Sequence, residues 1–175
     1  MRSSGLQRQM QLTMILAVAL TLHVVESLFP PLPVPGAKIG LANIASLVAL
    51  RYLGFGAAIG ISAARSILGS MLGGKFWGLG FWMSLSGATL SATAMGIALR
   101  VLPKGCSSVW ASVIGSIVHA SCQLAIAIIA LQQPGLLIGA PVLMGLSIVT
   151  GVFIGIACDS LDGAVRQYVR SRNRR

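Results

Sequence analysis

The sequence predicts an all-α integral membrane protein built as a bundle of six transmembrane helices, the second of which is short. Three observations support this fold class. Of the 175 residues, 55% are apolar and only 9% are charged. The charged residues gather near the chain ends and in short loops, which leaves long apolar runs between them. A crossing helix needs roughly 20 apolar residues, and a soluble domain of this length lacks the polar surface to cover so many apolar helices.

Glycine, proline and polar residues divide the chain into six apolar segments. The expected helices are 11–29, 39–53, 54–72, 76–101, 108–131 and 136–158. The expected organisation is an N-terminal tail (1–10), one transmembrane domain (11–158) and a basic C-terminal tail (159–175). The second helix is the shortest, because about 15 residues at ~1.5 Å per residue extend only ~22 Å.

The distribution of basic residues predicts the orientation of the helices. If the short second helix crosses, both chain ends lie on one side of the membrane, together with Arg51, Arg100 and Lys104. Only Lys38 and Lys75 then face the other side. Because cytoplasmic loops carry an excess of lysine and arginine, we expect a multi-pass protein of the cell membrane with both termini cytoplasmic. Five arginines in the last ten residues suit anionic lipid headgroups, so membrane lipid is an expected partner and nucleic acid is not.

Small residues recur at helical spacing, as is typical of helices that pack closely within lipid. The stripes are Thr13, Ala17 and Thr21; Gly56, Gly60 and Ala64; Ser84, Ala88, Ala92 and Gly96; and Ser147, Gly151 and Gly155. They predict a compact bundle, and the same stripes suit contact with a partner subunit.

Ionisable and polar side chains inside the apolar segments predict a binding site. A charged side chain at membrane depth costs about 2.5–3.5 kcal/mol on insertion scales, and such residues usually face the bundle interior. The predicted orientation gathers them in the outer half of the bundle, where they form a small polar pocket. The candidate substrate-binding residues are Glu26, Lys38, Asn43, Arg65, His119 and Gln123, with His23 and Lys75 in secondary positions.

These residues are also able to serve a structural purpose, by joining helices instead of binding a ligand. Glu26 is able to neutralise Arg65 or Lys38 in an ion pair that joins helices. His119 and Gln123 are four residues apart and therefore able to form a hydrogen-bonded pair on one helix face.

We do not expect catalytic activity from this chain. It has no GxxxxGK[ST] motif for the phosphates of ATP and no cluster of metal ligands, so no cofactor is expected. Of its three acidic residues, Asp159 and Asp162 form a bare DxxD motif and are expected to pair with arginines. A magnesium–diphosphate enzyme needs more carboxylates than this. We therefore expect a protein that is not an enzyme.

Several short motifs stand out along the chain: Pro35-Gly36-Ala37-Lys38 and Gly40-Leu41-Ala42-Asn43, Arg65 with Gly69, and His119 with Gln123. With these motifs the sequence resembles the Gx transporter family, whose members are often labelled heptaprenyl diphosphate synthase component I. It covers about residues 12–158. It implies a fold similar to the substrate-binding subunits of energy-coupling-factor transporters, which are six-helix vitamin binders that open outward. Those subunits work with separate ATPase and scaffold subunits, which become expected partners.

Two functions follow as hypotheses. In the first, the chain is a transport subunit that captures a small vitamin-like or anionic organic molecule from outside. In the alternative, it is a membrane accessory subunit (component I) of heptaprenyl diphosphate synthase, in which Lys38 and Arg65 hold a diphosphate while the bundle shelters the isoprenoid tail.

Overall fold

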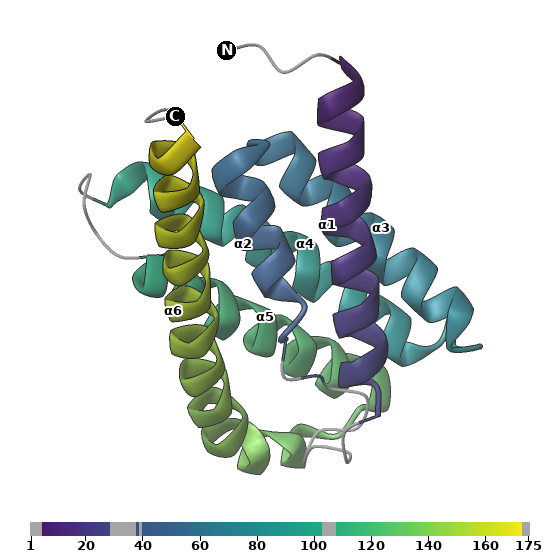
Figure 1. Cartoon of the computed structure of the whole chain (residues 1–175). Helices are drawn as coiled ribbons and strands as arrows, with labels where there is room; N and C mark the ends of the chain where they lie inside the picture. The colour runs from purple at the N-terminus through teal and green to yellow at the C-terminus, as the bar shows by residue number, and fades with distance from the viewer. Residues whose placement is uncertain (1–4, 29–37, 39, 103–107, 173–175) are drawn as a thin grey trace.

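The computed structural model describes residues 5–28, 38, 40–102 and 108–172, and the side chains of these residues as far as Gly163. Within this part the chain forms helices and turns without a β-strand, which confirms the all-α prediction. The elements are α1 (Gly5–Glu26), α2 (Asn43–Tyr52), α3 (Phe55–Leu72), α4 (Leu79–Val101), α5 (Ser108–Leu131), the short 3₁₀-helix η1 (Pro134–Gly139) and α6 (Ala140–Arg172) (Figure 1).

Four helices differ from their expected bounds. α2 begins at Asn43, four residues after the expected start. α1 begins at Gly5, six residues before the expected start. α4 begins only at Leu79, because Trp77 in the preceding turn has a positive φ of 65° that an α-helix does not accommodate. α6 follows the 3₁₀ turn and continues past Cys158 to Arg172, since no proline interrupts the polar residues there. The proline-rich residues 30–36 and the loop with Lys104 and Cys106 lie outside the described residues.

The prediction of six membrane spans is confirmed only in part. Four helical segments are long and apolar enough to cross a membrane: Gly5–Glu26, Phe55–Leu72, Ser108–Leu131 and Pro134–Gly163. α2 has 10 residues and therefore extends only ~15 Å. α4 has 23 residues, but serine, threonine and glycine make it less apolar, and ten of its residues are buried in the bundle.

α4 and α5 form the centre of the bundle, with α3 packed on α4 and α6 packed on α5. The short α2 lies among α3, α4 and α6, and α1 covers α2 and α3 (Figure 1). Glycine permits the close contact of α5 with α6. A Cβ atom added to Gly155 would lie 2.3 Å from Val109 Cα, and one added to Gly151 would lie 2.7 Å from Val113 Cα. The small-residue stripe of α6 therefore packs as expected.

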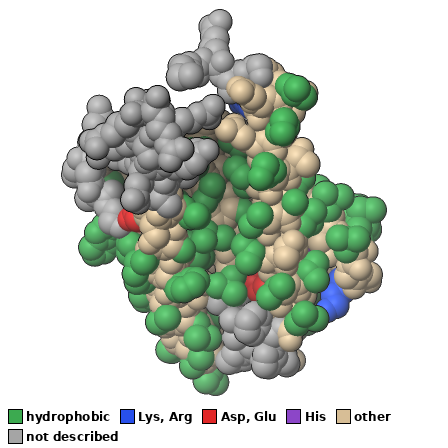
Figure 2. Space-filling view, viewed as in Figure 1, with side chains coloured by type: hydrophobic (Ala, Val, Ile, Leu, Met, Phe, Trp, Pro, Cys, Tyr) green, Lys and Arg blue, Asp and Glu red, His purple; other side chains and the backbone are tan. Residues whose placement is uncertain are grey.

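Two other small-residue stripes face outward instead. Gly56 and Gly60 are exposed and have no atom within 4 Å of an added Cβ. On α1, Thr13, Ala17 and Thr21 are exposed, and the buried residues are Ala19, His23 and Glu26. The outer face around these helices is dominated by hydrophobic side chains with few charges (Figure 2). This surface composition suits lipid, in agreement with the membrane class.

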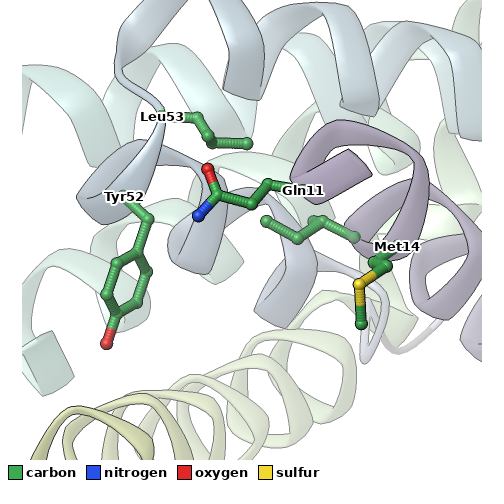
Figure 3. Close-up of a pocket in the computed structure, with 5 residues that line it drawn as sticks. Gln11, Met14, Tyr52 and Leu53 are labelled. Carbon is green, nitrogen blue, oxygen red and sulfur yellow. The ribbon is translucent and has the colours of Figure 1, made fainter. Parts of the chain in front are cut away.

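The start of α1 and the end of α6 lie at the same end of the bundle (Figure 1), as the charge distribution predicts. At this end an apolar groove of about 180 Å³ lies between α1 and α2 (Figure 3). Its lining residues are Gln11, Met14, Ile15, Tyr52 and Leu53. The other end of α1 carries His23 and Glu26, so the groove is separate from the predicted binding residues.

Candidate functional site

Seven of the eight predicted site residues lie in one buried group, which we call the polar cluster. Its members are His23, Glu26, Lys38, Asn43, Arg65, His119 and Gln123. They come from the end of α1, the segment before α2, the start of α2, and the middle of α3 and α5. Except for the half-buried Lys38, each side chain is at most 5% exposed. The helices therefore gather these costly polar groups at one place inside the bundle.

Glu26 is the last residue of α1, and its side chain forms hydrogen bonds with the backbone of the segment that leads into α2. Its Oε1 accepts hydrogen bonds from the backbone N–H of Gly40 and from that of Leu41, the latter at 3.2 Å. Among the described residues, no lysine or arginine nitrogen lies within 4.0 Å of this carboxylate. The ion pair considered for Glu26 is therefore replaced by bonds to backbone donors.

Lys38 joins α1 to α5 through both its side chain and its backbone. Its Nζ donates to Ser27 Oγ at 2.9 Å and lies 2.8 Å from His23 Nε2. Its backbone N–H donates to Gln123 Oε1 at 3.1 Å. Burial lowers the pKa of Lys38 to about 8, while nearby Glu26 opposes this shift. Lys38 therefore stays mainly protonated at neutral pH.

Arg65 lies in the middle of α3 with only 2% of its surface exposed. Its Nη2 donates to Asn43 Oδ1 at 2.7 Å. Within the described part of the chain, no carboxylate lies within 4.0 Å of Arg65, and its Nε has no hydrogen-bond partner. A buried guanidinium without a paired anion is costly, so this residue is the strongest indication of a missing partner.

His119 and Gln123 form the side of the polar cluster on α5. Gln123 Nε2 lies 2.9 Å from His119 Nε2. Because an amide nitrogen only donates, His119 Nε2 accepts this bond, and the ring is neutral with its proton on Nδ1. The expected pairing of these two residues is present.

Three glycines make room for the histidine rings. A Cβ added to Gly69, one turn beyond Arg65 on α3, would lie 2.4 Å from His23 Cδ2. The ring of His119 lies between Gly40 and Gly87, whose added Cβ atoms would lie 3.3 Å and 3.0 Å from it. Gly40 also has a φ of +90°, a region that favours glycine. These contacts give a physical role to the Gly40 and Gly69 positions of the sequence motif.

Lys75 is the predicted site residue that lies apart. It is exposed in the turn after α3, and among the described residues its side chain makes no hydrogen bond or ion pair. Two contact residues were not predicted, Ser27 and Gly87. The position of Ser27 in the sequence could have indicated its role, because Ser27 follows Glu26 directly and lies one helical turn after His23. Gly87 had none, because its role depends on the position of another helix.

A second group of charges, which we call the ion cluster, lies at the end of the bundle where α1 begins. Arg51 Nη1 pairs with Asp159 Oδ1 at 2.9 Å and with Asp162 Oδ2 at 2.7 Å. Tyr52 also donates to Asp162, and Ser108 accepts from Arg51. The pairing expected for the two aspartates is therefore present, with Arg51 of α2. These bonds join the end of α2 and the second half of α6 to the start of α5.

One buried face of α5 connects the two clusters. Ser108, Ser112 and Ser116 follow at intervals of four residues, and His119 and Gln123 continue the same face. Among the described residues there is no group of three or more His, Cys, Asp or Glu side chains that could hold a metal ion.

Apolar outward faces, spanning helices and a buried polar interior define a polytopic membrane protein with an internal polar site. The family model for heptaprenyl diphosphate synthase component I matches residues 15–161. The chain therefore belongs to this family, the Gx transporter family named above. No curated protein matches the chain, and no solved structure matches it.

Proposed function

We propose that this chain is a substrate-binding subunit that captures a small organic molecule from outside the cell and presents it for transport. The observation that supports this most strongly is Arg65, a buried arginine with an unpartnered Nε and no carboxylate within 4.0 Å among the described residues. Intramembrane charges of this kind usually serve a ligand or ion path. In this proposal a bound ligand supplies the missing partner.

The arrangement of charges supports capture from outside. Arg51 and Arg100 lie at the end where α1 begins, whereas Lys38 and Lys75 lie at the opposite end with the polar cluster. With the positive-inside rule, the chain ends are cytoplasmic and the polar cluster lies in the outer half of the cell membrane. The sequence contains no ATP-binding motif, so separate ATPase and scaffold subunits are the proposed energy source.

The test is mass spectrometry of small molecules released from the purified protein in mild detergent. A metabolite present in the unmodified protein and lost from Arg65→Ala supports the proposal. The control is Arg8→Ala, which removes an exposed arginine at the other end of α1. If Arg65→Ala and Glu26→Ala leave ligand content and uptake unchanged, the polar cluster is not the binding site.

A second candidate function is favoured by the family description, which names one component of a synthase. In this case the chain is a membrane accessory subunit, Lys38 and Arg65 bind a diphosphate, and the bundle shelters an isoprenoid tail. The test is to combine the purified chain with a partner prenyl synthase and to measure product length and rate. No change in either quantity argues against the accessory role.

A further inference from the structure

The hydrogen-bond acceptors of the polar cluster are largely occupied by the protein itself. Asn43 Oδ1 accepts from Arg65, and Gln123 Oε1 accepts from the backbone of Lys38. Glu26 Oε1 accepts from two backbone N–H groups. His119 Nε2 accepts from Gln123, as its amide geometry requires. Apart from the second carboxylate oxygen of Glu26, few acceptors are therefore left for a ligand that donates hydrogen bonds.

In the polar cluster, the buried side-chain atoms without a hydrogen-bond partner are nitrogen atoms. Arg65 Nε and Asn43 Nδ2 have no hydrogen-bond partner among the described residues, and both only donate. His23 Nδ1 also has none. Because His23 Nε2 faces the ammonium group of Lys38 at 2.8 Å, Nε2 accepts, and the proton of the neutral ring lies on Nδ1. His119 Nδ1 carries the ring proton and also has no partner. The cluster therefore presents unused N–H groups from four elements, α1, α2, α3 and α5.

The charges of the polar cluster do not balance. When Glu26 is ionised, the positive charges of Lys38 and Arg65 exceed its negative charge by one, because both histidines accept at Nε2 and are neutral. One positive charge is left in excess inside a largely buried site. A buried charge without compensation is strongly unfavourable. A ligand with one negative charge neutralises the site, whereas one with several negative charges reverses its sign.

We propose that the ligand of the polar cluster is an organic monoanion whose single carboxylate-like group accepts hydrogen bonds, and that it carries no ammonium group. This inference rests on the proposed function and narrows its substrate class. A zwitterion brings an ammonium group that needs free acceptors, and a diphosphate brings more negative charge than the site can neutralise. Oxygen atoms of one carboxylate satisfy the unused N–H groups and the excess charge together.

The first experiment determines the charge class of the metabolite released by the unmodified protein and lost from Arg65→Ala. Separation by ion exchange at pH 7 followed by mass spectrometry gives both net charge and the presence of an amine. The expected compound has one negative charge and no amine. A zwitterion, a cation or a diphosphate overturns the inference while leaving the binding function intact. A metabolite content that Arg65→Ala leaves unchanged overturns the proposed function itself.

The second experiment does not depend on a co-purified ligand. It measures the apparent melting temperature of the detergent-purified protein with four probes at equal concentration: butyrate, succinate, γ-aminobutyrate and inorganic pyrophosphate. We expect butyrate to stabilise most. Glu26→Gln raises the excess charge to two and should move the preference from butyrate to succinate, whereas Lys38→Gln removes the excess and should abolish the response to butyrate. An equal or greater response of the unmodified protein to any other probe, or no response to butyrate, contradicts the inference.

Discussion

Gly69 offers a direct test of how α3 positions His23. Replacing it with alanine places a Cβ atom 2.4 Å from His23 Cδ2 and 2.8 Å from His23 Nε2. Real Cβ atoms do not approach other heavy atoms this closely, so the imidazole ring must move. That ring is held by Lys38 Nζ at 2.8 Å and is only 2% exposed. The movement therefore breaks a contact of the polar cluster.

The expected magnitude follows from two opposing effects. Overpacking a tight site costs about 1–3 kcal/mol, while alanine in place of glycine inside a helix gains about 0.5–1 kcal/mol. Gly69→Ala should therefore lower the free energy of unfolding by up to about 2.5 kcal/mol. Gly60→Ala is the matched control on the same helix, because it has no atom within 4 Å of the added Cβ. This control should raise the free energy of unfolding by about 0.5–1 kcal/mol.

The assay is a denaturant titration of both variants in detergent micelles, followed by circular dichroism, with metabolite content measured in parallel. Gly69→Ala should be less stable than the unmodified protein and should retain less metabolite, whereas Gly60→Ala should retain it fully. If Gly69→Ala is as stable as Gly60→Ala and keeps its metabolite, the contact of His23 with α3 is not as the structure has it.

Three further predictions concern other parts of the bundle. Because the pKa of Lys38 is lowered to about 8, metabolite retention should fall as pH rises through 8. The free energy of unfolding should rise between pH 8 and 10.5, because only the unfolded state keeps the proton of Lys38 in that range. Lys38→Arg should remove both changes. Arg51→Ala opens the ion cluster and should speed maleimide labelling of buried Cys158 several-fold in a chain without the other cysteines. An unchanged labelling rate argues against the idea that the ion cluster shields Cys158 from the reagent. Ser62→Ala breaks a 2.7 Å hydrogen bond to another serine and should lower the free energy of unfolding by about 1 kcal/mol. Ser112→Ala removes a hydroxyl that has no partner and should leave the free energy of unfolding nearly unchanged. Equal losses of the two variants in denaturant titrations contradict this assignment of hydrogen bonds.

Much of the fold was predictable because hydropathy and helix breakers act locally. Long apolar runs cannot be left in water, so they predict membrane helices wherever they occur. The shortness of α2 was predicted from its length between breakers, although its start at Asn43 depends on the positive φ of Gly40. The exposure of Gly60 was not predictable, because a small-residue stripe has the same spacing whether it faces a helix or lipid.

The composition of the polar cluster was also predictable, since a charged side chain in an apolar segment is costly wherever it lies and therefore turns inward. What each member bonds was decided by tertiary structure alone. Glu26 contacts backbone N–H groups near Gly40, not the guanidinium of Arg65, because the chain before α2 returns to the end of α1. The unpartnered Nε of Arg65 likewise depends on which residues of distant helices lie within hydrogen-bond distance. The sequence by itself determined the class of the protein and the polar residues of its interior. Only the packed helices decided which donors have no partner, because hydrogen bonds act over about 3 Å between residues far apart in the chain.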